Sequence, residues 1–496
     1  MSNFNLENYS SGEKRKVLFV VPPQHIEEYY GRLASVGARL PWMGMAYVIG
    51  AVQAVGHEVK LVDCEAESVG FDELKEIIKD FSPDVICASA VITNVDRCLR
   101  TMQIAKDISS DVITVLGGPQ VTIFPEQVIA EKSIDFIVIG EGEITMCEIL
   151  LHLDEINRLE QIQGIWFKKN GNIVKNQGKE LIEDMDSIPF PALGMYNMDN
   201  YYPAAYIWGK KVLPILSARG CAFECRFCEA RLIFQRKFRF HSADRVVSEI
   251  NNLIDVHRAD SFQFMDDIFT LNKNRVHELC SKIIENGRKF KWSCFTRTDC
   301  IEPELLLKMK EAGCYLICFG CESGDQKLLD LLNKKLTIEK NCEGIKMTKK
   351  AGIRAFSTFM LGLPTETEEM TMKTIDFAVK SSLDYAIFPI LEPYPGTEIY
   401  EDALKMGYFI NEDGKKVVPN CKDKKIWVPD GRERKEIERK GYTAMKKFYL
   451  RPHIICSLVI GMLRNLPRKR LVRLFYGGIS YFITARFERV KYGTRY

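Results

Sequence analysis

The 496-residue sequence predicts an α/β protein with two successive strand–helix modules and a helical C-terminal region. Short apolar runs alternate with helical stretches over about the first 150 residues, and the same alternation resumes near Lys211. Alternation of this kind is typical of parallel sheets covered by helices. Apolar residues make up 46% of the chain and charged residues 27%, as in ordinary globular cores. The predicted units are residues 1–150, 151–205, 206–400 and 401–496.

The first module begins with Lys16–Val21, an apolar run that predicts a buried parallel strand. A helix is expected over Trp42–Val55, ending at Gly56, and another over Phe71–Phe81. The further predicted strands are Glu58–Val62, Val85–Ser89, Val112–Leu116 and Phe136–Ile139. The expected form is a doubly wound parallel sheet, whose ligands bind beyond the carboxyl ends of the strands.

Small residues follow three of these strands. Glycine allows a ligand to approach the backbone closely, because no side chain stands in the way. We therefore expect a ligand to contact Ser89, Gly117, Gly118, Gly140, Glu141 and Gly142.

The segment between the modules predicts a small β-hairpin over residues 161–178, turning at Asn170-Gly171. A proline-containing linker, Asp186–Pro203, leads into the second module. There a helix is expected over Ala243–Val256 with Ser242 as its N-cap. The predicted strands are Val212–Ser217, Phe262–Met265, Trp292–Phe295, Leu316–Phe319, Ala355–Leu361 and Ala386–Leu391.

Three cysteines, Cys221, Cys225 and Cys228, follow the first strand of the second module with the spacing C-x3-C-x2-C. Three thiolates on one short loop can hold three irons of a [4Fe–4S] cluster. No fourth cysteine lies nearby in the sequence, so one iron would remain open to a substrate or cofactor. The alternatives are a structural zinc loop, which usually needs four ligands, and buried thiols without a metal.

The cysteine motif, with Phe227 before its last cysteine, resembles that of the radical S-adenosylmethionine (SAM) superfamily. The resemblance covers residues 210–400 and implies a partial (β/α)6 TIM-type barrel with its chemistry at the carboxyl ends of the strands. It also implies that SAM binds the open iron and is cleaved reductively to a 5′-deoxyadenosyl radical. The other motifs that carry it are Met265–Phe269, Arg297-x-Asp299, Gly320–Gly324, Gly362–Thr367 and Pro393–Thr397.

The resemblance assigns the SAM contacts to Asp266, Arg297 and Glu322. The Glu322 carboxylate suits the ammonium or ribose hydroxyls of SAM, and the Arg297 guanidinium suits its carboxylate. Other roles remain open for all three. Asp266 could cap a helix, Arg297 could form a barrel salt bridge, and Glu322 could be a structural hydrogen-bonding group.

Residues 15–150 resemble the Rossmann-like cobalamin-binding domain of one radical SAM class. That class includes anaerobic Mg-protoporphyrin ester cyclase and many carbon methylases. The matching elements are Leu40–Gly44, Gly56–Val59, Gly117–Pro119 and Gly140–Glu143. The resemblance implies that cobalamin contacts the strand-end residues named above. The D-x-H-x-x-G motif of other cobalamin domains is absent from the sequence, so no lower cobalt ligand is assigned. The alternative is a Rossmann-like module without a ligand.

Charge is distributed unevenly along the chain. Residues 446–496 hold twelve Lys or Arg and one acid, for a net +11; since the whole chain carries +3, the rest carries −8. The apolar run Ile454–Leu463 is too short to span a bilayer, and a second run covers Leu474–Ala485. Apolar helices beside basic clusters predict peripheral contact with an anionic membrane; the alternative is a helical cap on the barrel. No nucleic-acid partner is expected.

The scattered cysteines lie in or near apolar runs and predict small buried side chains in a reducing, cytoplasmic protein. They are Cys64, Cys87, Cys98, Cys147, Cys314 and Cys318. No secretory signal opens the sequence.

The leading prediction is a cobalamin-dependent radical SAM enzyme that methylates an unactivated carbon of an unknown small molecule, such as a lipid, isoprenoid or tetrapyrrole. An external flavodoxin or ferredoxin would supply electrons. The residues that act on the substrate are not predicted. The alternatives are an oxidative cyclase that transfers no methyl group, a methylthiotransferase, and a non-enzymatic iron–sulfur sensor.

Overall fold

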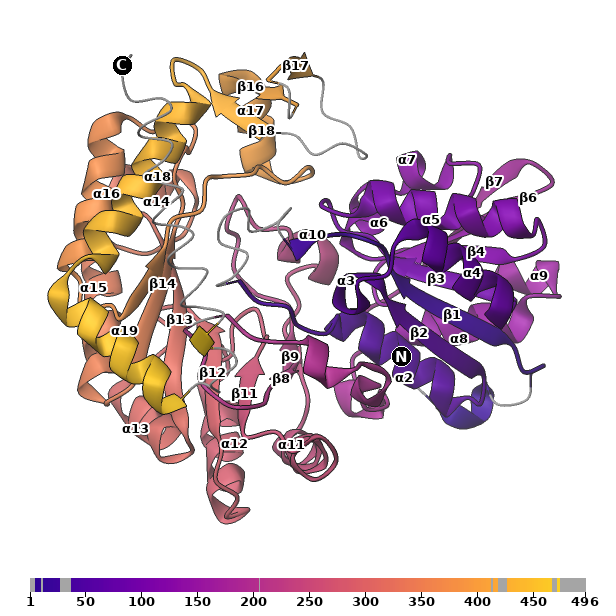
Figure 1. The fold of residues 1–496 in the computed structure, drawn as a ribbon, viewed down its shortest axis with the longest axis horizontal. Helices are drawn as coiled ribbons and strands as arrows, with labels where there is room; N and C mark the ends of the chain where they lie inside the picture. The colour runs from indigo at the N-terminus through magenta and orange to yellow at the C-terminus, as the bar shows by residue number, and fades with distance from the viewer. Residues whose placement is uncertain are drawn as a thin grey trace.

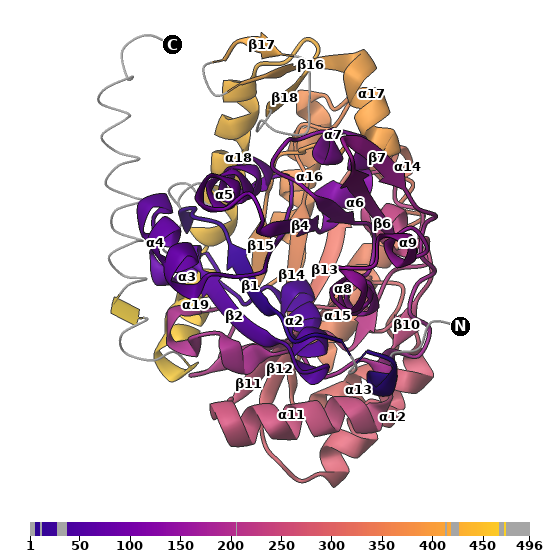
Figure 2. The same cartoon turned by 90° about the vertical axis from the view of Figure 1, so that its right-hand side faces the viewer.

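Two α/β modules lie side by side in the computed structural model, with a loop that carries the short helix α10 (Ala230–Phe234) between them (Figure 1). Seen from the side of the first module, that module lies in front of the strands of the second (Figure 2). The structure describes residues 5–9, 12–26, 37–204, 206–411, 414–417, 426–465 and 471–472.

The first sheet has seven strands in the order β2-β1-β3-β4-β5-β6-β7. The first five along the chain pair in parallel, which confirms the doubly wound prediction, and β6 and β7 add an antiparallel edge. The predicted hairpin is therefore part of this sheet. The strands are β1 (Lys16–Val21), β2 (Glu58–Asp63), β3 (Val85–Ser89), β4 (Ile113–Gly117), β5 (Phe136–Val138), β6 (Ile165–Lys169) and β7 (Asn172–Lys175).

Helices cover both faces of this sheet because alternate residues of β1 point to opposite sides. Val17 and Phe19 pack in the core that contains α2 and α8, whereas Leu18 and Val20 pack in the core that contains α4 and α5. The helices are α2 (Met43–Ala54), α3 (Cys64–Glu67), α4 (Phe71–Phe81), α5 (Val95–Ile108), α6 (Pro119–Ile123), α7 (Pro125–Ile129), α8 (Glu143–His152) and α9 (Ile156–Leu159).

The second module contains an open sheet of six parallel strands in the order β15-β14-β13-β12-β11-β8. This arrangement confirms the predicted partial barrel. The strands are β8 (Val212–Ile215), β11 (Ser261–Phe264), β12 (Lys291–Thr296), β13 (Cys314–Glu322), β14 (Arg354–Phe359) and β15 (Tyr385–Ile387). Two short antiparallel strands, β9 (Ala218–Arg219) and β10 (Arg239–Phe240), join the ends of the α10 loop.

Helices follow the strands of this sheet in turn. Ser242 caps α11 as expected, accepting a hydrogen bond from the Arg245 amide at 3.2 Å. The helices are α11 (Ala243–His257), α12 (Lys273–Glu285), α13 (Pro303–Glu311), α14 (Gln326–Leu331), α15 (Ile338–Lys350) and α16 (Glu368–Lys380).

The C-terminal region differs from the prediction, because it is not helical throughout. Beside α17 (Glu398–Met406), α18 (Arg434–Tyr449) and α19 (Pro452–Asn465) it contains a three-stranded antiparallel sheet. The strands, β16 (Gly407–Ile410), β17 (Lys416–Val417) and β18 (Ile426–Pro429), are too short to show a clear period in the sequence.

Trp427 anchors this small sheet, since its side chain is fully buried and its indole N–H donates to the Ala403 carbonyl at 3.1 Å. None of the helices in the described part of the chain is long and apolar enough to cross a membrane. The predicted apolar run Leu474–Ala485 lies outside the described residues. The six scattered cysteines are buried, as predicted.

Candidate active site

Two adjoining cavities form the candidate site, one between the modules and one within the second module. The larger, of about 690 Å³, opens between the carboxyl ends of β3, β4 and β5 and the loops of the second module. The smaller, of about 230 Å³, lies at the carboxyl ends of β12, β13 and β14. Phe227, Cys228, Ala230 and Asp267 line both. Molecules in the two cavities would therefore be close neighbours.

The three predicted cluster cysteines all line the smaller cavity, on the loop between β9 and α10. Gly220 shapes the start of this loop with a φ of +88°, and a Cβ there would lie 2.0 Å from the Lys237 carbonyl oxygen. No other residue fits this position without moving the backbone. Burial raises the pKa of the Cys228 thiol to about 12. A thiol of this kind stays protonated at neutral pH unless a metal takes the place of the proton and stabilises the thiolate.

The described residues include no group of three His, Cys, Asp or Glu side chains arranged around a single metal ion. Around a cubane cluster each thiolate binds a different iron, so the sulfurs stand further apart than the ligands of one zinc ion. Three cysteines that line one cavity can bind three irons of a [4Fe–4S] cluster.

Arg297 follows β12, lies 3% exposed and lines the smaller cavity. Its guanidinium lies 3.7 Å from the ring centre of Phe223, and Nη1 is 3.9 Å from the Cys225 sulfur. Nε and Nη2 donate to the two carboxylate oxygens of Asp299 at 2.9 Å each. Arg297 thus forms the barrel salt bridge that the sequence left open, and still places one nitrogen beside the cluster loop.

Glu322 ends β13 and also lines the smaller cavity. Its φ of 64° is in the left-handed region, which is rare for a non-glycine residue and common at functional sites. One carboxylate oxygen lies 3.1 Å from the Lys334 ammonium, and the other lies 3.3 Å from the Thr358 hydroxyl. The carboxylate thus faces the cavity as part of a small polar cluster.

Lys334 is a buried cation of this cavity that the sequence did not single out. Burial opposes its charge, but the Glu322 carboxylate raises the pKa of the lysine above its usual value. The ammonium also lies 5.6 Å from the ring centre of Phe227. In the sequence, Lys334 and Lys335 look like an exposed charged pair after a helix, so no local signal separates the buried lysine from its neighbour.

Asp266, which was predicted to contact SAM, is not among the residues that line the two cavities. Its side chain is buried in the barrel and accepts hydrogen bonds from the Ser217 amide and hydroxyl at 2.6 and 2.5 Å. The neighbouring Asp267 instead lines both cavities and accepts a hydrogen bond from the Gly220 amide at 3.0 Å. Burial raises the pKa of Asp267. Consecutive residues after a strand point in different directions, and of this pair Asp267 is the one that lines the cavities.

All six strand-end residues predicted in the first module line the larger cavity: Ser89, Gly117, Gly118, Gly140, Glu141 and Gly142. Gly118 has a φ of +100°, and a Cβ there would lie 2.6 Å from the Ser89 hydroxyl. Gly140 has a φ of +84°, and no atom lies within 4 Å of where its Cβ would stand. The backbone therefore leaves open space beside the cavity.

The cavity suits a broad ligand with a largely apolar face. Its lining includes the apolar side chains Phe19, Leu40, Met43, Val48, Val115, Leu216, Phe234 and Met265. No histidine is among the described residues that line it, in agreement with the absence of the D-x-H-x-x-G motif. Glu141 differs from the other five predicted residues, because its carboxylate pairs with Arg219 and Arg239.

Comparison with known proteins agrees with this geometry. The B12-binding domain model matches residues 30–150, and the radical SAM superfamily model matches residues 215–378. An uncharacterised methyltransferase of Pyrococcus horikoshii is 32% identical over 93% of this chain and 99% of its own length. Anaerobic magnesium-protoporphyrin IX monomethyl ester cyclase of Rubrivivax gelatinosus is 29% identical over 96% of this chain and 84% of its own length.

Among solved structures, the radical SAM methyltransferase TsrM of Kitasatospora setae, with cobalamin and a [4Fe–4S] cluster bound, has a TM-score of 0.69. The match covers 95% of this chain and 100% of TsrM at 14% identity, so it bears on the fold alone. The cofactors of the present chain are a [4Fe–4S] cluster, SAM and cobalamin. Together the two domain models, the full-length relative and the adjoining cavities show that the chain is an enzyme of the cobalamin-dependent radical SAM family, which includes methyltransferases.

Proposed function

We propose that this enzyme methylates an unactivated carbon of a small molecule that binds at the boundary between the two cavities. The observation that supports the proposal is the boundary shared by the two cavities, formed by Phe227, Cys228, Ala230 and Asp267. Bound SAM and the cluster supply hydrogen-atom abstraction, and bound cobalamin supplies a methyl group. A substrate at the shared boundary would be within reach of both.

The residues of the chain contribute an environment rather than a proton relay. Met43, Leu216 and Met265 present apolar surface to the larger cavity and exclude water from it. Among the polar side chains that line it, Tyr394 has its pKa raised to about 12 by burial. Its hydroxyl therefore stays protonated at neutral pH and can donate a hydrogen bond. This lining favours a mainly apolar substrate, such as a lipid, isoprenoid or tetrapyrrole.

The test uses anaerobically reconstituted enzyme with dithionite and SAM that carries a deuterated methyl group. Methyl transfer predicts 5′-deoxyadenosine together with label in the corrinoid fraction. Formation of 5′-deoxyadenosine without label in that fraction would favour the cyclase alternative, which uses cobalamin without methyl transfer. Absence of 5′-deoxyadenosine would favour the iron–sulfur sensor.

We also propose an acidic electron donor of the flavodoxin or ferredoxin type. Two exposed cations flank the cluster loop: Arg236, whose side chain is 57% exposed, and Lys335, which is 62% exposed. Both pair with Glu224, which directly precedes Cys225. In the variant Arg236→Glu, half-maximal SAM cleavage should need more flavodoxin, whereas the dithionite-driven rate should not change. An equal loss with both reductants would contradict this docking site.

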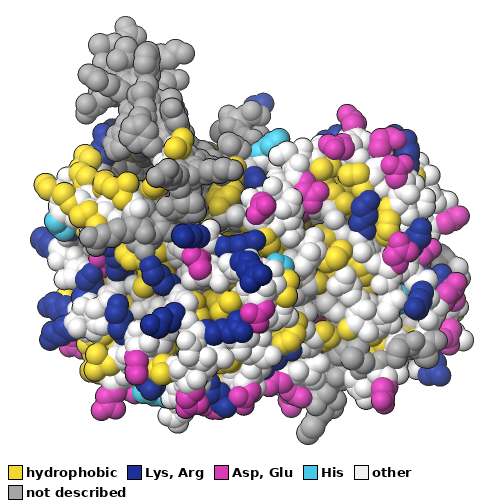
Figure 3. Space-filling model, turned by 60° about the horizontal axis from the view of Figure 1, so that its bottom comes forward, with side chains coloured by type: hydrophobic (Ala, Val, Ile, Leu, Met, Phe, Trp, Pro, Cys, Tyr) yellow, Lys and Arg dark blue, Asp and Glu magenta, His cyan; other side chains and the backbone are white. Residues whose placement is uncertain are grey.

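The C-terminal helix supports a second partner, an anionic membrane on the cytoplasmic side. Exposed apolar side chains gather on the face of the molecule that Figure 3 shows. On α19 and the turn before it, the exposed apolar side chains are Leu450, Ile455, Val459, Ile460 and Leu463. Five basic residues follow closely in the sequence: Arg464, Arg468, Lys469, Arg470 and Arg473. This combination suits the interface of an anionic bilayer.

The variant Leu463→Asp should weaken binding to phosphatidylglycerol vesicles, because it places a charge in the apolar face. Leu307→Asp is the matched control, since Leu307 is 59% exposed on α13 and Leu463 is 65% exposed. Equal binding of the two variants would remove the membrane proposal.

A further inference from the structure

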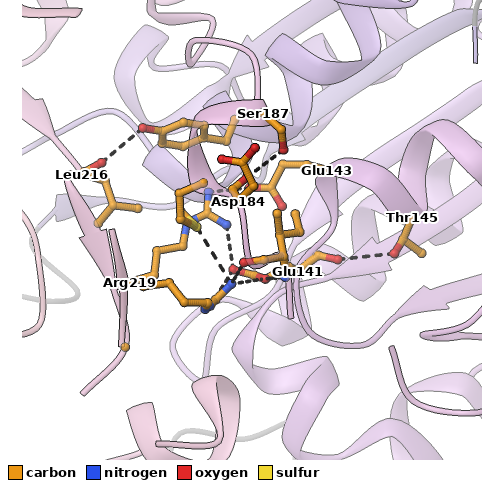
Figure 4. Close-up of polar contacts among 12 residues, drawn as sticks. Glu141, Glu143, Thr145, Asp184, Ser187, Leu216 and Arg219 are labelled. Atoms are coloured by element: carbon orange, nitrogen blue, oxygen red, sulfur yellow. Dashed lines mark hydrogen bonds and ion pairs between the residues drawn. The ribbon is translucent and has the colours of Figure 1, made fainter. Parts of the chain in front are cut away.

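A buried ion-pair network joins the loop that lines the larger cavity to the loop that carries the cysteines. Arg219 lies two residues before Cys221, in β9. Its Nη1 donates to Glu141 at 2.9 Å, and its Nη2 donates to Glu143 at 2.6 Å (Figure 4). Glu141 lies between Gly140 and Gly142, so one guanidinium connects the edges of both cavities.

A second arginine completes the network. Arg239, in β10 beside β9, donates to both carboxylate oxygens of Glu141 at 2.8 and 3.0 Å and to the Ile182 carbonyl at 2.5 Å. The Ile182 amide in turn donates to Glu141 at 2.8 Å. Two arginines therefore face two glutamates, and the buried charges balance.

All four side chains are shielded from water. Their exposed fractions are 6% for Arg219, 6% for Glu141, 3% for Glu143 and 8% for Arg239. Burial alone would raise the pKa of Glu141, but the two arginines hold it below its usual value. Forked, charge-assisted bonds in such surroundings fix geometry strongly, because breaking one leaves a charge buried without a partner.

The contact extends to the helix of the first module. The Arg219 guanidinium lies over the ring of Tyr47, which belongs to α2, with its carbon 4.9 Å from the ring centre. The Tyr47 hydroxyl donates to the Leu216 carbonyl at 3.3 Å, at the end of β8 (Figure 4). The two modules thus touch through directional bonds at the point where their cofactor loops meet.

We infer that Arg219 is a positioning residue that sets the separation and orientation of cobalamin relative to the [4Fe–4S] cluster, acting through Glu141 and Glu143. The inference rests on the proposed function only in taking both cofactors to act on one substrate. A lysine in its place would keep the charge but could not reach both carboxylates in a planar fork.

The test measures the magnetic interaction between the reduced cluster and cob(II)alamin by electron paramagnetic resonance in the fully loaded protein. In Arg219→Lys both centres should be present. The strength of their magnetic interaction should change, and the distribution of its values should be broader than in the wild type. Arg288→Lys is the matched control, because Arg288 forms a similar forked pair with Asp255 on the surface, at 2.6 and 3.1 Å. Its spectrum should equal that of the wild type.

An unchanged spectrum of Arg219→Lys, with both centres bound, would overturn the inference. If that variant does not fold, the same spectrum is measured for Glu143→Gln, which keeps the side-chain shape and removes one ionic contact. If neither variant assembles both centres, the network serves folding and the positioning role is rejected. The spectrum does not depend on methyl transfer, so a failure of the proposed function would appear separately, as absence of label in the corrinoid fraction.

Discussion

The two cavities have different kinds of lining residues, although four residues line both. The larger is formed mainly by glycine backbone at strand ends and apolar side chains, whereas the lining of the smaller includes the buried charges of Arg297, Lys334 and Glu322. Cobalamin is large and needs space and a close approach to backbone. SAM is small and carries an ammonium, a carboxylate and a sulfonium, which charged groups can bind. Substitutions should therefore separate the two cofactors.

The largest effect is expected from Cys225→Ala. Loss of one thiolate should abolish the brown visible chromophore and SAM cleavage, while cobalamin retention should stay close to the wild-type level. Iron content and absorbance of anaerobically purified protein measure this. Cys318→Ala is the control, because Cys318 lines the same cavity outside the motif. A full iron complement in Cys225→Ala would contradict the assignment of the ligands.

The variant Gly140→Leu should have the opposite selectivity, losing cobalamin and keeping the cluster. The new side chain would extend into open space beside the larger cavity, so retention of hydroxocobalamin after desalting should fall about tenfold or more, and the cluster should remain. A positive φ also strains a leucine by about 1–2 kcal/mol. Gly171→Leu controls for that strain, because Gly171 has a φ of +79° and equally open surroundings in the β6–β7 turn. Similar cobalamin retention by both variants would refute the cavity assignment.

A smaller, selective effect is expected from Arg297→Lys. Loss of the forked guanidinium should weaken SAM binding by about tenfold, since a hydrogen bond to a charged group contributes about 1.5–3 kcal/mol. The SAM concentration that gives half-maximal 5′-deoxyadenosine formation measures this, and cobalamin retention should not change. If that concentration stays at the wild-type value, Arg297 only supports the barrel through Asp299.

The contrast between the cavities also explains what the sequence could predict. Glycines after strands and closely spaced cysteines are local patterns, so their places at the cavity edges were predictable from the order of residues. Lys334 and Arg219 depend on partners 12 and 78 residues away, Glu322 and Glu141, which no local pattern indicates. The choice between Asp266 and Asp267 depends on side-chain direction at a strand end, which follows from packing against Ser217.

The last effect is on pH-dependent stability and leaves cofactor binding unchanged; it concerns a buried acid near the boundary of the two modules. Burial raises the pKa of Glu249 to about 7, and Arg245 opposes this less strongly. The unfolded chain loses this proton near pH 4.5, so the wild type should lose stability as the pH rises from about 4.5 to 7, by up to about 3 kcal/mol. Relative to the wild type, Glu249→Gln should therefore gain thermal stability across this window and remain at a constant advantage above it.

His241, in the same region, should make stability depend on pH in the opposite direction. Burial lowers its pKa to about 4, so the unfolded chain binds the proton more tightly and wild-type stability rises with pH from about 4 to 6.5. The variant His241→Asn should therefore lose stability relative to the wild type over that range. Melting temperatures of the three proteins between pH 4.5 and 8 measure both slopes. Parallel curves for all three proteins would show that Glu249 and His241 have the same pKa in the folded and unfolded chains. The boundary between the modules would then differ from the smaller cavity, where burial and neighbouring charges shift pKa values.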